Sequence, residues 1–295
     1  MKPKDVLNLA APQTWAGSIA PATVGLAVSY NVQGHLDLMM AVCFYLIVLL
    51  MQSAVNAFDD YADFVKGTDT LENSPDAEDA VIVYGMPARW ALRLGFVFLI
   101  LALIPAGYVV MECGVVPLVI GLTGALVLFC YAFGKYPISY LPLGELLCGF
   151  VMGGLIPLAG FYMQTRVLDW HVLYLTIPPM LGMAVNMFSN NGCDIDRDLP
   201  AGRKTLACLI GLKRTATAYR ILLILWVLSP AVILATELRW TGVLVYLLEL
   251  LAFVHLVIRQ YRHQLGPQAR DAVMTGATTL VSLVAFTYSV AILVG

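Results

Sequence analysis

Nine long apolar segments dominate this 295-residue sequence. They lie near residues 14–31, 36–58, 87–111, 114–133, 142–164, 172–192, 214–236, 241–259 and 273–294. Each has about the 20 residues that a helix needs to cross the ~30 Å hydrocarbon core of a bilayer. The segments are continuously apolar and lack the alternating pattern of a membrane β-barrel. We therefore predict an all-α membrane protein, with residues 1–295 forming one domain of nine transmembrane helices.

Basic residues are distributed unevenly between the two ends of these segments. Nine spans place 15 of the 17 lysines and arginines on the side of the N-terminus, and only Arg166 and Arg239 on the other side. Because basic residues gather in cytoplasmic loops, we predict a cytoplasmic N-terminus in a bacterial cell membrane. The two longest polar stretches, near 59–86 and 193–213, lie on this same side, where we therefore expect the functional site.

An amide and three acids end the second apolar segment. Asn56, Asp59, Asp60 and Asp63 have the spacing i, i+3, i+4 and i+7. This spacing predicts that the four side chains share one stripe of a helix.

A second group with similar spacing ends the sixth segment. Asn190, Asp194 and Asp198 have the spacing i, i+4 and i+8, which again predicts one helical stripe, with Asp196 and Arg197 pointing elsewhere. The two groups lie in matching positions, within 56–69 and 190–204, and this indicates two pseudo-repeated halves that face a central cavity.

Both groups concentrate negative charge where a helix ends. The helix dipole disfavours negative charge there, so each group requires a positive partner. Carboxylate and amide oxygens suit Mg²⁺, which bridges carboxylates to a phosphate-bearing substrate. We predict that Mg²⁺ is held by Asn56, Asp59, Asp60, Asp63, Asn190, Asp194 and Asp198, with Asp60, Asp63, Asp194 and Asp198 as catalytic residues. The alternative is that these side chains are solvated helix caps.

Basic side chains follow each acidic group. We predict that a diphosphate is bound by Lys66, Lys135, Arg203 and Lys204, together with Tyr131. Basic groups beside a metal hold the remaining phosphate oxygens. The alternative is that these bases only set the membrane orientation.

Four sequence blocks resemble the UbiA superfamily of intramembrane prenyltransferases. They are PQTW at 12–15, DDYADFVKGTD at 59–69, LGELLCG at 143–149 and NNGCDIDRDLPAGRKTLA at 190–207. The resemblance implies nine helices around a cavity and a Mg²⁺-bound polyprenyl diphosphate whose prenyl group is transferred to an aromatic ring. Within the family the chain is most similar to the menaquinone branch, whose acceptor is 1,4-dihydroxy-2-naphthoate. The family usually has Asn where this chain has Asp59.

Two further functions fit parts of the pattern. A prenyltransferase of the same family with another aromatic or lipid acceptor would carry the same acids. An ion-coupled secondary transporter also has intramembrane acids and repeated halves, although the acids of a transporter lie nearer the bilayer midplane than those of this chain. In each case we expect a lipid bilayer around the protein and no nucleic-acid partner.

Overall fold

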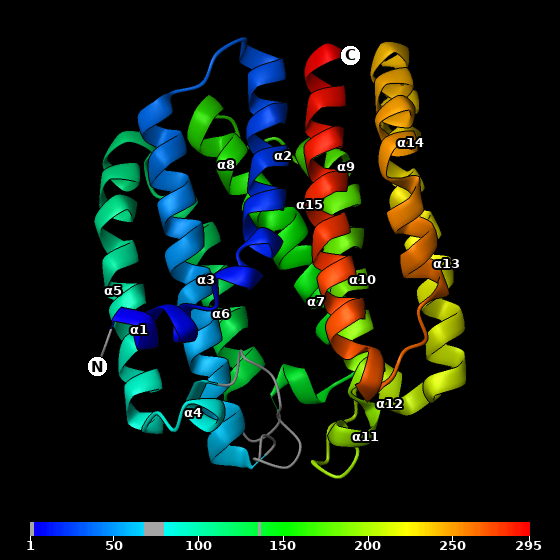
Figure 1. The fold of residues 1–295 in the computed structure, drawn as a ribbon. Helices are drawn as coiled ribbons and strands as arrows, with labels where there is room; N and C mark the ends of the chain where they lie inside the picture. The colour runs from blue at the N-terminus through cyan, green and yellow to red at the C-terminus, as the bar shows by residue number, and fades with distance from the viewer. Residues whose placement is uncertain (1–2, 68–79, 135–136) are drawn as a thin grey trace.

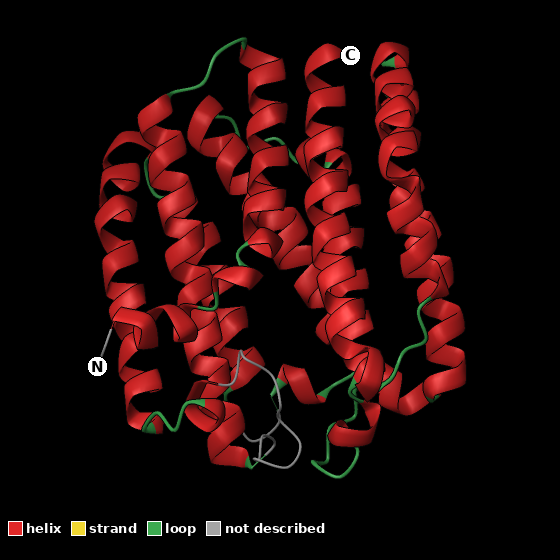
Figure 2. Cartoon of the chain, in the orientation of Figure 1, coloured by secondary structure: helices red, strands yellow, loops and turns green. Residues whose placement is uncertain are grey.

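The computed structural model describes residues 3–67, 80–134 and 137–295, and all the regular structure within these ranges is helical (Figures 1 and 2). The longer helices are α2 (Ala16–Gln33), α3 (Leu38–Lys66), α5 (Ala88–Cys113), α6 (Val116–Ala132), α8 (Ile156–Thr165), α10 (Ile177–Cys193), α13 (Leu212–Thr236), α14 (Trp240–Arg262) and α15 (Arg270–Val294). The shorter helices are α1 (Pro3–Ala10), α4 (Ala80–Val83), α7 (Gly144–Phe150), α9 (His171–Leu175), α11 (Ile195–Asp198) and α12 (Leu206–Ile210). A π-helical turn, Val151–Leu155, joins α7 to α8.

Every apolar segment of the sequence coincides with helix. Within the described ranges, six helical stretches are long and apolar enough to cross a membrane: Leu38–Lys66, Ala88–Cys113, Gly144–Thr165, Leu212–Thr236, Trp240–Arg262 and Pro267–Val294. The other three segments correspond to α2, α6 and the pair α9 and α10, which are shorter or less uniformly apolar. The all-α membrane class is confirmed, while nine spans and the cytoplasmic N-terminus stay predictions.

Local chemistry sets the ends of α3, the helix that carries the first acidic group. The carboxylate of Asp37 accepts a hydrogen bond from the Met40 backbone N–H at 3.0 Å and so caps the first turn. At the other end Gly67 has φ 71°, a left-handed conformation that glycine adopts without steric cost. These two signals fix a helix that continues past the apolar segment and includes the acids.

Close packing of small residues joins the helices. A Cβ atom added to Gly25 of α2 would lie 2.6 Å from the backbone of Pro157 in α8. Such contacts between small residues let membrane helices approach closely. Helix α2 also packs against α15, so helices from the two ends of the chain are neighbours (Figure 1).

The ends of α3 and α10 lie at the same end of the bundle, together with α4, α11 and α12 (Figure 1). We call this the site end. Two acidic groups that form one site must lie at the same end of the bundle, as these do. The internal repeat of two halves stays a prediction.

Candidate active site

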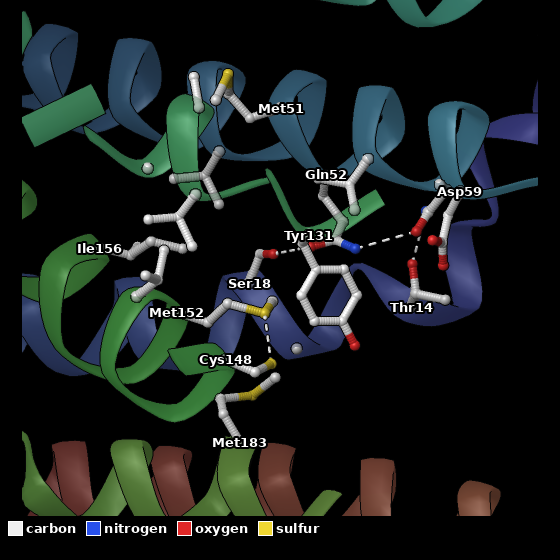
Figure 3. Close-up of a pocket in the computed structure, with 18 of the residues that line it drawn as sticks. Thr14, Ser18, Met51, Gln52, Asp59, Tyr131, Cys148, Met152, Ile156 and Met183 are labelled. Atoms are coloured by element: carbon white, nitrogen blue, oxygen red, sulfur yellow. Dashed lines mark hydrogen bonds between the residues drawn. The ribbon is translucent and has the colours of Figure 1, made fainter. Parts of the chain in front are cut away.

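A cavity of about 1620 Å³ lies among α2, α3, α5, α6, α8, α10 and α15. Apolar side chains, including Met51, Ile156 and Met183, line one part of it (Figure 3). The polar side chains that line it include Asn56, Asp59, Asp63, Asn190, Arg203 and Arg270. The cavity thus combines an apolar part with a charged region at the site end.

The first acidic group divides between the cavity and a neighbouring helix. Asn56, Asp59 and Asp63 line the cavity, but Asp60 is buried and accepts hydrogen bonds from the Val81 backbone N–H at 3.2 and 3.4 Å. Residues turn by about 100° each around a helix, so Asp60 occupies the edge of the predicted stripe on the side of α4.

Asn56 forms hydrogen bonds that connect α3 to residues 10–14, which precede α2. Its side-chain amide donates to the Ala10 carbonyl and to Thr14 Oγ1, both at 2.8 Å. Its carbonyl oxygen accepts from Gln52 Nε2 at 3.1 Å. The side chain predicted as a metal ligand therefore also positions the segment that precedes α2.

The second acidic group does not lie on one continuous helix, and that prediction is wrong. Helix α10 ends at Cys193, and Asp194 has φ −100° and ψ 8°, which interrupts the helix before α11 begins. As a result Arg197, which we expected to point elsewhere, lines the cavity and donates to Asp194 Oδ2 at 2.9 Å. Asp196 is exposed, as expected.

Arg203 connects the two acidic groups. Its Nη2 atom lies 2.7 Å from both carboxylate oxygens of Asp63, and its Nη1 atom lies 3.4 Å from Asp198 Oδ1. Burial disfavours its charge, but Asp63 and Asp198 outweigh that effect and raise the pKa of Arg203. The guanidinium also faces the Tyr140 ring at 5.2 Å. One buried cation thus holds acids from two distant parts of the sequence together.

Asp198 is the most deeply buried acid of the site. Burial raises the pKa of its carboxyl to about 6, against the opposing effect of Arg203. Its Oδ2 atom is buried without a hydrogen-bond partner among the described residues. The side chain therefore has an oxygen available to a further ligand.

Arg270, at the start of α15, is a site residue that the sequence analysis did not single out. It donates to Asp194 Oδ1 at 2.8 Å and to Asn190 Oδ1 at 2.9 Å. Its only sequence signal is its place among the basic residues of the predicted cytoplasmic side. The cation that balances Asp194 from another helix becomes visible only when α15 packs against α10.

Two of the remaining predicted diphosphate ligands, Lys66 and Lys204, contact Tyr140, whose ring Arg203 also faces. Lys66 donates to the Ala132 carbonyl and lies 5.2 Å from the Tyr140 ring centre. Lys204 is exposed, and its backbone N–H donates to the Tyr140 carbonyl at 3.0 Å. Tyr131 lines the cavity, with its hydroxyl 3.4 Å from Met187 Sδ. Lys135 lies outside the described residues, as do positions 68 and 69 of the first segment.

The potential metal ligands at the site end are of the kind that a hard cation prefers. They are carboxylate and amide oxygens, and besides Asp198 Oδ2 the Asn186 Oδ1 atom is buried without a hydrogen-bond partner in the described ranges. Within those ranges, however, no three His, Cys, Asp or Glu side chains are grouped closely enough to hold a metal ion. Arginines already pair with the carboxylate oxygens of Asp63, Asp194 and Asp198, so a cation and the arginines would compete for the same oxygens.

The helical fold and the cavity define an integral membrane protein with a charged site at one end of a largely apolar cavity. Residues 18–290 match the UbiA prenyltransferase family. The chain belongs to this family and is a prenyltransferase, which confirms the predicted enzyme class and leaves the transporter alternative without support.

Two relatives extend the match. The chain is 32% identical over 212 residues to 1,4-dihydroxy-2-naphthoate octaprenyltransferase of Bacillus subtilis, covering 71% of this chain and 67% of that protein. It is 27% identical over 297 residues to the protein of the same name from Haemophilus influenzae, covering 97% and 94%.

A solved structure shares the fold. The UbiA homolog from Archaeoglobus fulgidus, solved with GPP and Mg²⁺, has a TM-score of 0.70 at 15% identity and covers 98% of this chain and 99% of its own.

Proposed function

We propose that this protein transfers a polyprenyl group from polyprenyl diphosphate to 1,4-dihydroxy-2-naphthoate in a Mg²⁺-dependent step of menaquinone biosynthesis. The proposal rests on one observation. Arg203 pairs with an acid from each of the two acidic groups, at the charged end of a cavity of about 1620 Å³. An amphiphilic donor with an anionic head and a long apolar tail matches that division of the cavity. The names of the two bacterial relatives support the naphthoate acceptor.

The metal ligands are proposed from both acidic groups. Asp59 and Asp63 line the cavity, and Asp198 retains a buried oxygen. Asp60 accepts a backbone N–H, but a carboxylate has about four acceptor positions, so it stays in the proposed set with Asn56, Asn190 and Asp194. Bound Mg²⁺ would neutralise charge on the diphosphate and so improve it as a leaving group.

Basic residues complete the proposed head-group site. As the diphosphate enters, Arg203 and Arg270 exchange carboxylate oxygens for phosphate oxygens, which a guanidinium binds with the same geometry. The released carboxylates are then free to act as ligands. This exchange accounts for a site whose acids are paired with arginines and not gathered around one point.

Transfer requires one bond to break and one to form. The allylic C–O bond of the donor breaks, and the diphosphate leaves with the electron pair, held by the arginines. A carbon of the hydroxylated ring attacks the allylic cation and forms a C–C bond. The ring then regains aromaticity by losing a proton or, where the carbon bears the carboxylate, CO₂.

The proposal is tested with protein purified in detergent. Geranyl diphosphate, 1,4-dihydroxy-2-naphthoate and Mg²⁺ should give the prenylated product by mass spectrometry and release pyrophosphate, and removal of the metal with EDTA should stop both. Product formation that is unaffected by EDTA would contradict the metal dependence. Turnover only with a different aromatic acceptor would contradict the naphthoate assignment.

A further inference from the structure

A directed chain of side-chain hydrogen bonds follows the cavity wall between α2 and α3. Ser18 Oγ donates to Gln52 Oε1 at 2.5 Å, and Gln52 Nε2 donates to Asn56 Oδ1 at 3.1 Å. Asn56 Nδ2 then donates to Thr14 Oγ1 at 2.8 Å (Figure 3). Each donor and acceptor role in the chain is set by the neighbouring residue.

Gln52 retains hydrogen-bonding capacity on the cavity side. A glutamine amide nitrogen carries two N–H donors, and among the described residues that of Gln52 makes one hydrogen bond. Its carbonyl oxygen is held by Ser18, which is 2% exposed. The second N–H is therefore a neutral donor on a side chain of fixed orientation that lines the cavity.

Gln52 lies one helical turn before Asn56, at the edge of the head-group site that adjoins the apolar part of the cavity. Along α3 it precedes Asp59 by seven residues and Asp63 by eleven, which corresponds to about 10 and 16 Å at 1.5 Å per residue. It follows Met51, which lines the apolar part of the cavity. Gln52 thus lies where the polar and apolar parts meet.

Neither part of a prenyl diphosphate satisfies a donor at this place. The anionic head is balanced by the arginines of the site end, and the hydrocarbon tail has no hydrogen-bond acceptor. A spare N–H donor that a bound substrate covers costs free energy unless the substrate supplies an acceptor, so the second substrate, with its oxygen substituents, is the one that matches it. Tyr131 lines the same cavity (Figure 3), and its ring offers a face for an aromatic molecule.

We infer that Gln52, held in orientation by Ser18, is the acceptor-binding residue of this enzyme and donates a hydrogen bond to an oxygen substituent of the aromatic acceptor. This inference rests on the proposed function. It assigns the acceptor to the junction of the two cavity parts, where its ring carbon meets the allylic end of the donor.

The test compares Gln52→Met with the wild-type enzyme, using geranyl diphosphate and 1,4-dihydroxy-2-naphthoate. Loss of one hydrogen bond should raise the KM of the acceptor by about five- to tenfold, with a clearly smaller change in the KM of geranyl diphosphate, since Gln52 also bonds the proposed metal ligand Asn56. Ser18→Ala should raise the acceptor KM less, because the amide is present but loses its fixed orientation. Equal increases for both substrates, or none, would overturn the inference.

Two control variants match these substitutions outside the cavity. Gln164→Met removes a buried glutamine that bonds the Asp37 backbone, and Ser29→Ala removes a buried serine of α2 that bonds the Gly25 carbonyl. Both should leave the acceptor KM at the wild-type value. An increase as large as that of Gln52→Met would show a general packing effect and contradict the assignment.

Acceptor analogues separate contact from folding. The wild-type enzyme should lose kcat/KM when the acceptor lacks the oxygen that Gln52 binds, whereas Gln52→Met should be indifferent to that loss. We would therefore assay both enzymes with naphthoates that lack each hydroxyl in turn. Equal losses in both enzymes for every analogue would refute the acceptor contact of Gln52 but not the proposed reaction. A wild-type enzyme that is inactive with every hydroxylated acceptor would refute the proposed reaction as well.

Discussion

At the residue scale, Arg203 is the counter-charge of two acids that the sequence separates widely. Replacing it with Leu would leave Asp63 and buried Asp198 without their cation. Breaking a buried pair in this way costs about 3 kcal/mol or more. We expect Arg203→Leu to lower the free energy of unfolding in mixed micelles by about that amount, whereas Arg262→Leu, an exposed arginine at the end of α14, should change it little.

A double-mutant cycle tests whether this loss arises from the uncompensated acid. Asp198→Asn removes the charge that Arg203 balances, so the double variant should be less destabilised than the sum of the two single variants. Strictly additive losses would contradict the pairing.

Residue identity could be predicted better than residue partnership. The acids were identifiable because charge is rare and costly in apolar segments. Their partners were not, because Arg270 contacts Asn190 and Asp194 only after α15 packs beside α10. The sequence likewise contains no signal that the Asp60 carboxylate accepts the Val81 N–H.

At the element scale, the break between α10 and α11 decides which side chains reach the cavity. A spacing of i, i+4 and i+8 predicts a stripe only if one helix continues through it, and α10 ends at Cys193. The following turn brings Arg197 to Asp194. The first acidic group was predicted more accurately because α3 does continue to Lys66.

Helix contacts at glycine give a prediction at the same scale. Gly25→Ala would place a Cβ 2.6 Å from the Pro157 backbone, so α2 and α8 must separate, at a cost of about 1–3 kcal/mol. Gly107→Ala in α5 has no neighbouring atom within 4 Å and should be neutral or slightly stabilising. The measurement is the unfolding midpoint of both variants in detergent, and equal midpoints would contradict the close α2–α8 contact.

At the scale of the whole molecule, the apolar pattern predicted the helical membrane class because a bilayer leaves few alternatives. The pattern predicted the number of spans less directly, because α2, α6 and α10 are shorter than the six helical stretches that are long enough and apolar enough to cross a membrane. Glycines, prolines and polar residues lower the hydropathy of α2 and α10, whereas α6 is strongly apolar and is only shorter.

Orientation is the prediction that belongs to this scale. Nine spans with a cytoplasmic N-terminus place Gly295 on the opposite side of the membrane. Alkaline phosphatase fused after Gly295 should therefore be active in a bacterial host, while the same enzyme fused within the loop 193–213 should be inactive. Activity at the loop alone would reverse the orientation, and equal activity at both positions would exclude an odd number of spans between that loop and the C-terminus.

The central claim is that the two acidic groups form one Mg²⁺-dependent site for a prenyl diphosphate. Calorimetric titration of geranyl diphosphate into the purified protein tests it most directly, using wild type, Asp63→Asn, Asp198→Asn and Asp196→Asn. We predict binding only with Mg²⁺, a loss of affinity of at least about tenfold when either Asp63 or Asp198 is changed, and wild-type affinity for exposed Asp196→Asn. Binding that persists without Mg²⁺, or that survives the change in either acidic group, would contradict the claim.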